Sequence, residues 1–213
     1  MIKEQKSKYN CNSVSLYGEV MSNKVFAHKM FGESFYYVDI KVNRQSNNSD
    51  IIPILISDRV IKETDEFLGM FVRVKGQFRS FNRSVDGKNL LVLHVFADVF
   101  EVVGTECTGE DCNEIKLEGF ICKSPNYRKT PLDKEVCDVL LAVNRSYKKS
   151  DYIPCITWGR NAKFMARLAV STKVKVLGRI QSREYNKKDI DGVITKRTAY
   201  EVSIFAIEIN QEV

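Results

Sequence analysis

Flat aromatic rings and positive charges alternate along the second half of this 213-residue chain. Four aromatic residues in this half have basic neighbours: Tyr147, Tyr152, Trp158 and Tyr185. Aromatic faces stack on unpaired bases and cations contact phosphates, so this combination suits a single-stranded nucleic acid. The cations predicted to contact phosphates are Arg128, Lys129, Arg145, Lys148, Lys149, Arg179, Arg183, Lys187 and Lys188.

Residue patterns typical of catalysis are missing from the sequence. The two histidines, His28 and His94, stand in unrelated contexts, so no Ser/His/Asp or Cys/His constellation can be built around them. No Gly-rich phosphate loop is present. Asp50 and Asp151 each stand alone after loop residues, where an aspartate typically forms a turn. We therefore predict that the protein is not an enzyme.

The six cysteines do not have the spacing of a metal site. No Cys-x2-Cys pair occurs, and the closest two, Cys107 and Cys112, have four residues between them. Cys122, Cys137 and Cys155 lie in apolar segments, where cysteine behaves as a small hydrophobic residue. The sequence therefore predicts reduced cysteines, with no bound metal and no cofactor.

Composition and charge indicate an ordinary globular protein with a slight basic excess. Hydrophobic residues make up 44% of the chain, and the formal net charge is +6. The longest clearly apolar run, Ile51–Ile56, is too short to span a membrane, and the first ten residues lack the apolar core of a secretory signal. These features predict a cytoplasmic protein with no membrane partner.

An internal repeat is visible when the chain is shifted against itself by 101 residues. Asn12–Gly18 then aligns with Asn113–Gly119, and eight of the sixteen positions in Val38–Pro53 are identical to their counterparts in Val139–Pro154. The repeat predicts two homologous domains, residues 1–103 and 113–213, joined by an acidic linker over 104–112. The net charge is +2 for residues 1–103, −3 for the linker and +7 for residues 113–213, so the basic excess belongs to the second domain.

Hydrophobic alternation predicts the same element order in both copies. In the second copy, strands are expected over 115–123, 136–145, 152–158, 174–185 and 200–209, with a helix over 161–168. In the first copy, strands are expected over 14–21, 35–44, 51–57, 71–81 and 89–102, with a helix near 60–68. This order predicts an all-β protein with two tandem OB-folds, each a five-stranded Greek-key barrel with a short helix between its third and fourth strands. The paired glycines Gly18/Gly119 and Gly76/Gly178 fall where strands of such a barrel must bend.

Residues 113–209 resemble the bacterial single-stranded DNA-binding protein (SSB) family. The matching motifs are Asn113-x-Ile-x-Leu-x-Gly119, Ser124-Pro-Asn-Tyr-Arg128, Leu141-Ala-Val-Asn-Arg145, the run from Tyr152 to Ala162, and the run from Val176 to Tyr185. The resemblance implies sequence-independent binding of single-stranded DNA in replication, repair, recombination or plasmid and phage maintenance. It implies a nucleoid-associated bacterial protein whose four stacking positions are Tyr147, Tyr152, Trp158 and Tyr185.

The first copy keeps the fold signatures but lacks these stacking rings. At the four equivalent positions it has Ser46, Ile51, Ser57 and Arg83. Phe78, Phe81, Tyr36 and Tyr37 could replace the rings, although aromatic residues on strands more often belong to a core. We interpret the first domain as a weaker binder or an assembly domain.

The resemblance also implies a set of partners. SSB proteins assemble four OB-folds, so two per chain imply a homodimer. The sequence ends at Asn210–Val213 without the family's acidic tail, so recruitment of proteins by such a tail is not expected. Two alternatives stay open: a tail-less primosome or recombination accessory, and an OB-fold module for protein interaction. RNA also stays open as a ligand, because stacking alone does not read the 2′-hydroxyl.

Overall fold

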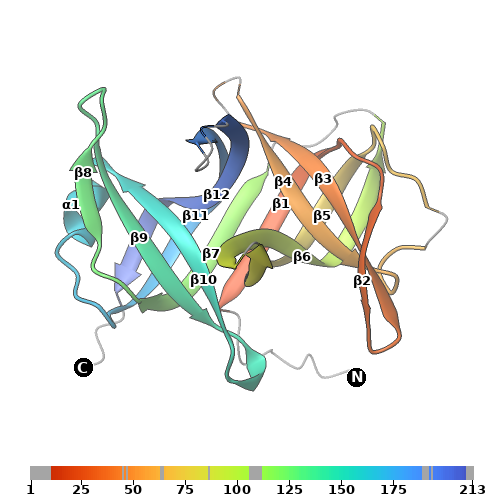
Figure 1. Cartoon of the computed structure of the whole chain (residues 1–213), viewed down its shortest axis with the longest axis horizontal. Coiled ribbons are helices and arrows are strands. Elements are labelled where there is room, and N and C mark those ends of the chain that lie inside the picture. The colour runs from red at the N-terminus through yellow and green to blue at the C-terminus, as the bar shows by residue number, and fades with distance from the viewer. Residues whose placement is uncertain are drawn as a thin grey trace, which may run out of the picture.

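The computed structural model describes residues 11–44, 46, 48–62, 65–85, 87–105, 112–188, 192 and 194–209, and it leaves the side chains of residues 85, 88, 147 and 188 undescribed. The predicted linker lies largely outside this description, as do residues 210–213. Two barrels of strands lie next to each other (Figure 1). Among the described residues, no helix has the length and apolar character needed to cross a membrane.

Each barrel is built from six strands. The N-terminal half contains β1 (Asn12–Val20), β2 (Val25–Met30), β3 (Glu33–Asn43), β4 (Ser49–Ser57), β5 (Phe71–Val85) and β6 (Lys88–Gly104). The C-terminal half contains β7 (Asn113–Ile121), β8 (Asn126–Lys129), β9 (Glu135–Asn144), the 3-10 helix η1 (Ser146–Lys148), β10 (Ser150–Trp158), α1 (Gly159–Met165), β11 (Lys173–Lys188) and β12 (Ile194–Ile209).

Five strands close into a ring in each half. In the N-terminal half the ring runs β1–β5–β6–β4–β3 and returns to β1, with β4 and β6 parallel. In the C-terminal half the ring runs β7–β11–β12–β10–β9 and returns to β7. These two rings confirm the predicted pair of OB-folds. The sixth strand of each half, β2 or β8, was not predicted and pairs with β3 or β9 in a hairpin.

The two barrels have similar cores and similar bends. Both interiors are filled by fully buried aliphatic residues, among them Leu16, Ile40, Ile54, Ile115, Leu141 and Ile153. The strand pairing shifts register at Gly76 and at Gly178. A Cβ atom would lie 2.0 Å from the Phe96 carbonyl oxygen at Gly76, and 2.5 Å from the Ser203 oxygen at Gly178. Only glycine therefore lets the crossing strands approach this closely, as expected of barrel bends.

Among the described residues, a helix between the third and fourth ring strands is found in the C-terminal half only. There α1 covers Gly159–Met165 and begins two residues before the predicted helix. The helix expected near 60–68 is wrong, because the described residues of this segment are turn, bend or irregular and none is helical. Val60 and Ile61 are β-branched, which disfavours a helix. In addition, the Asp65 carboxylate accepts a hydrogen bond from the N–H of Lys62 at 2.7 Å and so closes a turn.

The first strands of the two halves pair antiparallel and join both barrels in one twelve-stranded sheet. Val14 of β1 lies directly opposite Ile115 of β7. These residues are equivalents in the repeat at its shift of 101 residues, so the two halves are related by a pseudo-twofold axis through this pair. The chain thus contains within itself an isologous interface of the kind that symmetric dimers form.

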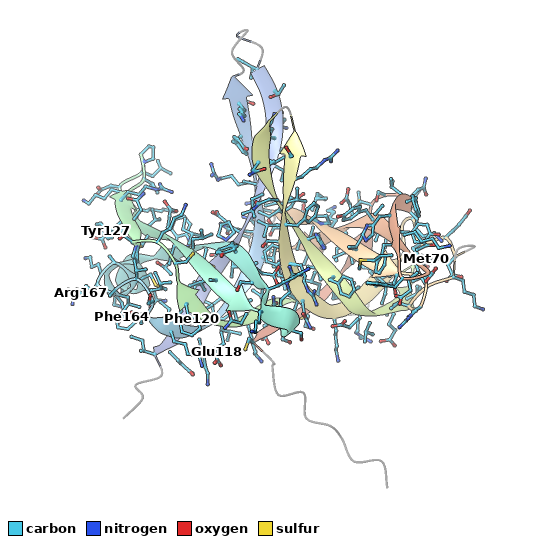
Figure 2. The ribbon with its side chains drawn as sticks, turned by 60° about the horizontal axis from the view of Figure 1, so that its bottom comes forward. Met70, Glu118, Phe120, Tyr127, Phe164 and Arg167 are labelled. Atoms are coloured by element: carbon cyan, nitrogen blue, oxygen red, sulfur yellow. The ribbon has the colours of Figure 1, made fainter. Side chains whose placement is uncertain are left out.

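Two long hairpins reinforce this pseudo-twofold interface. Figure 2 shows the β5–β6 hairpin in yellow and the β11–β12 hairpin in blue projecting from the region between the barrels. The Ser80 N–H donates to the Asp151 carboxylate of the other half at 2.7 Å, and the Ser182 N–H donates to Asp50 at 2.6 Å. Both aspartates are completely buried in strands. The expectation that they form turns is therefore wrong, because each one holds the hairpin of the opposite half.

Candidate nucleic-acid interface

A groove of about 720 Å³ runs across the C-terminal barrel. The β8–β9 hairpin, β10 and the β11–β12 hairpin supply its walls, and its charged and aromatic lining includes Arg128, Asp138, Trp158, Arg183 and Glu201. Arg128 and Lys129, two of the predicted phosphate contacts, both belong to β8. Strand pairing with Val136 and Glu135 fixes their backbone at the groove edge.

Two of the four predicted stacking residues lie on one exposed face of β10. Tyr152 is 47% exposed and Trp158 is 40% exposed, although neighbouring Ile153 and Thr157 are completely buried. Side chains alternate between the two faces of a strand, and Tyr152 and Trp158 are an even number of residues apart. Both rings therefore lie on the same, outward face of β10. The Trp158 indole N–H donates to the Ser203 hydroxyl at 3.3 Å, which orients the ring while its faces stay accessible. This arrangement provides flat surfaces for unpaired bases.

The other two predicted stacking residues belong to other elements than β10. Tyr185 is partly exposed on the outer part of β11, opposite Arg197 of β12. Tyr147 belongs to η1, and its side chain lies outside the described part of the structure. The structure therefore brings Tyr152 and Trp158 to one face and places Tyr185 on the long hairpin.

Trp158 connects the groove to two further hollows. One, of about 400 Å³, is lined by residues that include Lys129 and Lys134. The other, of about 530 Å³, is lined by residues that include Arg179 and, from the N-terminal half, Arg44. A strand stacked on Trp158 would therefore have basic side chains on both sides. Sequence analysis did not include Arg44, because only the contact between the two halves brings it here.

The cations predicted to contact phosphates differ in whether they already form an ion pair with a carboxylate. Arg128 binds Asp138 with its Nε 2.7 Å from the carboxylate, and Lys129 lies 2.8 Å from Asp133. Both pairs are largely exposed, so each contributes little stability and a phosphate can compete for the cation. By contrast, Arg183, Lys148 and Lys149 are exposed and make no ion pair with any carboxylate that the structure describes.

The remaining cations lie near the contact between the halves or on the hairpin. The Arg145 Nε lies 3.2 Å from buried Asp151, so its charge faces the interdomain contact. Burial and the nearby charge of Arg44 lower the pKa of Arg179, which lines the 530 Å³ hollow together with Trp158 and Arg44. Lys187 is partly exposed at the end of β11, and the Lys188 side chain lies outside the described residues.

The N-terminal half has a different surface at the equivalent place. Ser57 is buried, and Ile51, the counterpart of Tyr152, is aliphatic and 37% exposed. At the counterparts of Asp138, Arg183 and Glu201 this half has Tyr37, Phe81 and His94. Their rings contact one another, with the centroid of His94 5.8 Å from Tyr37 and 5.7 Å from Phe81. An aromatic cluster thus replaces the polar side chains of the groove.

Known proteins with similar sequences bind single-stranded DNA. The model of the "Single-strand binding protein family" matches residues 112–210. Single-stranded DNA-binding protein B of Bacillus subtilis is 35% identical over 92 residues, which cover 39% of this chain and 81% of that protein. The single-stranded DNA-binding protein of Enterococcus faecalis is 35% identical over 83 residues, which cover 36% of this chain and 44% of that protein.

A solved structure matches nearly the whole fold. The wild-type single-stranded DNA binding protein from Thermus aquaticus superposes with a TM-score of 0.73 at 17% identity, over 95% of this chain and 94% of that chain. At this identity the likeness establishes the shared fold of both halves, whereas the family rests on the sequence matches above. By the sequence of its C-terminal half, this chain belongs to the single-stranded DNA-binding protein family, whose members are not enzymes.

Proposed function

We propose that this protein coats single-stranded DNA without sequence preference, through the groove of its C-terminal half, during replication, repair or recombination. The observation that carries the proposal is the exposed pair Tyr152 and Trp158 on one face of β10, with cations on both sides. Large aromatic side chains normally bury their area in a core, so two exposed rings on a barrel face favour an external partner.

Base stacking and phosphate contacts both contribute to the affinity in this mechanism. Each base stacked on a ring contributes about 1–3 kcal/mol, whatever its identity, because every base has a flat face. Arg183, Lys148 and Lys149 are open to phosphates, while Arg128 exchanges Asp138 for a phosphate oxygen. Release of counterions from the DNA then makes the affinity fall steeply with salt.

The N-terminal half is proposed to act as a weaker binder or an assembly domain. Its counterparts of Tyr152 and Trp158 are Ile51 and Ser57, which offer no aromatic face. Since one chain already pairs two OB-folds through β1 and β7, a homodimer would bring together four. The expected assembly is therefore a homodimer.

Fluorescence of Trp158, the one tryptophan in the sequence, provides the test. Titration with oligo-dT and with oligo-dA should quench it, duplex DNA should do so far less, and high salt should weaken both titrations. Replacing Tyr152→Ala should weaken oligo-dT binding about 5- to 150-fold. Competition with RNA of equal length shows which nucleic acid is preferred.

A matched control is available at Phe164 of α1. This ring is 42% exposed, and Figure 2 shows it away from the two projecting hairpins. Phe164→Ala removes a similar exposed ring outside the groove, so it should leave oligo-dT affinity unchanged. Equal losses for both variants, or no binding by the wild type at low salt, would refute the proposed function.

A further inference from the structure

We propose that Ser80 of the N-terminal half is a positioning residue for the exposed aromatic face of β10 in the C-terminal half, where it fixes the backbone of Tyr152. This inference rests on the proposed function, in which the Tyr152 ring stacks on a base. It assigns the divergent half a direct part in building that face.

The contact consists of two short hydrogen bonds at the edge of β10. The Ser80 hydroxyl oxygen accepts from the Tyr152 N–H at 2.8 Å, and the Ser80 N–H donates to the Asp151 carboxylate at 2.7 Å. Ser80 is 6% exposed and Asp151 is completely buried, so water does not readily replace either bond. Ser80, in the interior of β5, thus contacts two successive residues of β10.

Among the strands that the structure describes, no other one pairs with this edge of β10 at Tyr152. On its opposite edge, β10 pairs with β9, where Tyr152 lies opposite Ala142. Its pairing with β12 involves only Cys155 and Ile156, which come after Tyr152 in the chain. The hairpin of the N-terminal half therefore takes the place of a neighbouring strand just where the stacking residue lies.

Fixing the backbone at Tyr152 also restricts where its ring can lie. The allowed side-chain rotamers depend on backbone dihedrals, so a backbone fixed from both edges holds the ring ready for a base. Preorganisation of this kind improves affinity because less freedom is lost on binding. The ion pair between Arg145 and Asp151, at 3.2 Å, adds a second restraint to the same segment.

The pseudo-twofold axis supplies a matched control in the same chain. Ser182, the counterpart of Ser80, donates its N–H to Asp50 at 2.6 Å and places its hydroxyl 3.1 Å from the same carboxylate. The residue after Asp50 is Ile51, which has no aromatic face. Both serines thus hold a hairpin against the other half, but only Ser80 lies next to a stacking residue.

The experiment compares Ser80→Ala with Ser182→Ala in the full chain. Each variant keeps the backbone N–H bond to aspartate and loses only the hydroxyl. By Trp158 quenching, Ser80→Ala should weaken oligo-dT binding about three- to tenfold, the usual effect of one lost hydrogen bond, whereas Ser182→Ala should change it less than twofold. Thermal unfolding of both variants measures the loss of stability that the two substitutions share.

A double-mutant cycle separates positioning from general destabilisation. If Ser80 acts through the ring, adding Ser80→Ala to Tyr152→Ala should cause no further loss of affinity. An equal effect of Ser80→Ala in both backgrounds, or equal effects of the two serine variants, would overturn the inference. If Tyr152→Ala by itself leaves affinity unchanged, the proposed function fails instead, so the two failures are distinguishable.

Discussion

His94 is a buried histidine whose protonation should oppose folding. Its side chain is enclosed by the rings of Tyr37 and Phe81, and only 6% of the residue is exposed. Burial, together with the positive charges of Arg79 and of Arg145 from the other half, lowers its pKa from the ordinary 6.5 to about 4. The folded protein therefore keeps this imidazole neutral at pH values where an unfolded chain would protonate it.

The magnitude follows from the difference between the two pKa values. Between pH 6.5 and pH 4 the unfolded state binds a proton that the folded state does not, so the free energy of unfolding falls as the pH falls. At about 1.4 kcal/mol per pKa unit, the shift from 6.5 to about 4 amounts to a loss of about 3 kcal/mol. This stability is fully present above pH 6.5.

Replacing His94→Phe isolates this contribution. Phenylalanine keeps an aromatic ring in the cluster but cannot bind a proton. Urea unfolding of both proteins at pH 7 and pH 4 should show the wild type losing about 3 kcal/mol more than the variant. Burial raises the pKa values of Asp98 and Asp151, but these groups are present in both proteins and largely cancel in the difference.

Proton NMR gives a second, direct measurement. The chain has two histidines, so the imidazole resonance missing from the His94→Phe spectrum belongs to His94. In the wild type this resonance should titrate well below pH 6.5. A midpoint near 6.5, or the same wild-type-minus-variant difference in unfolding free energy at both pH values, would refute the argument.

Two other predictions concern the bend in the barrel and the edge of the groove. Gly178→Ala would place a Cβ 2.5 Å from the Ser203 carbonyl oxygen, so we expect a destabilisation of about 1–3 kcal/mol in urea unfolding; an unchanged midpoint would show that the bulge can relax. Arg128→Gln should reduce the slope of log affinity against log salt by about 0.7 for oligo-dT. Lys196→Gln, at an exposed cation paired with Glu184 outside the groove, should keep the wild-type slope.

Local sequence patterns were enough to predict the repeated fold. Each ring strand and each barrel bend is encoded within a short stretch, such as the alternation that exposes Tyr152 and Trp158 while burying Ile153. The repeat of 101 residues gave the number of OB-folds, and the structure places its equivalents Val14 and Ile115 opposite each other. Patterns of this kind are visible in sequence because each depends on the period of a single element.

Only the tertiary structure decided which residues of one half contact the other half. Asp50 and Asp151 look like turn residues in sequence, but each binds a hairpin that lies 132 or 71 positions away in the chain. In place of the helix expected near 60–68, the structure has a turn closed by Asp65. Arg145 was predicted to contact phosphate, but its side chain pairs with Asp151 at the interdomain contact. Such contacts have no local signature, because a buried carboxylate finds its partner only when distant strands meet. The sequence by itself thus determined two OB-folds and predicted that Tyr152 and Trp158 share one face of a strand, whereas only the assembled structure showed the first half holding Tyr152 of the second.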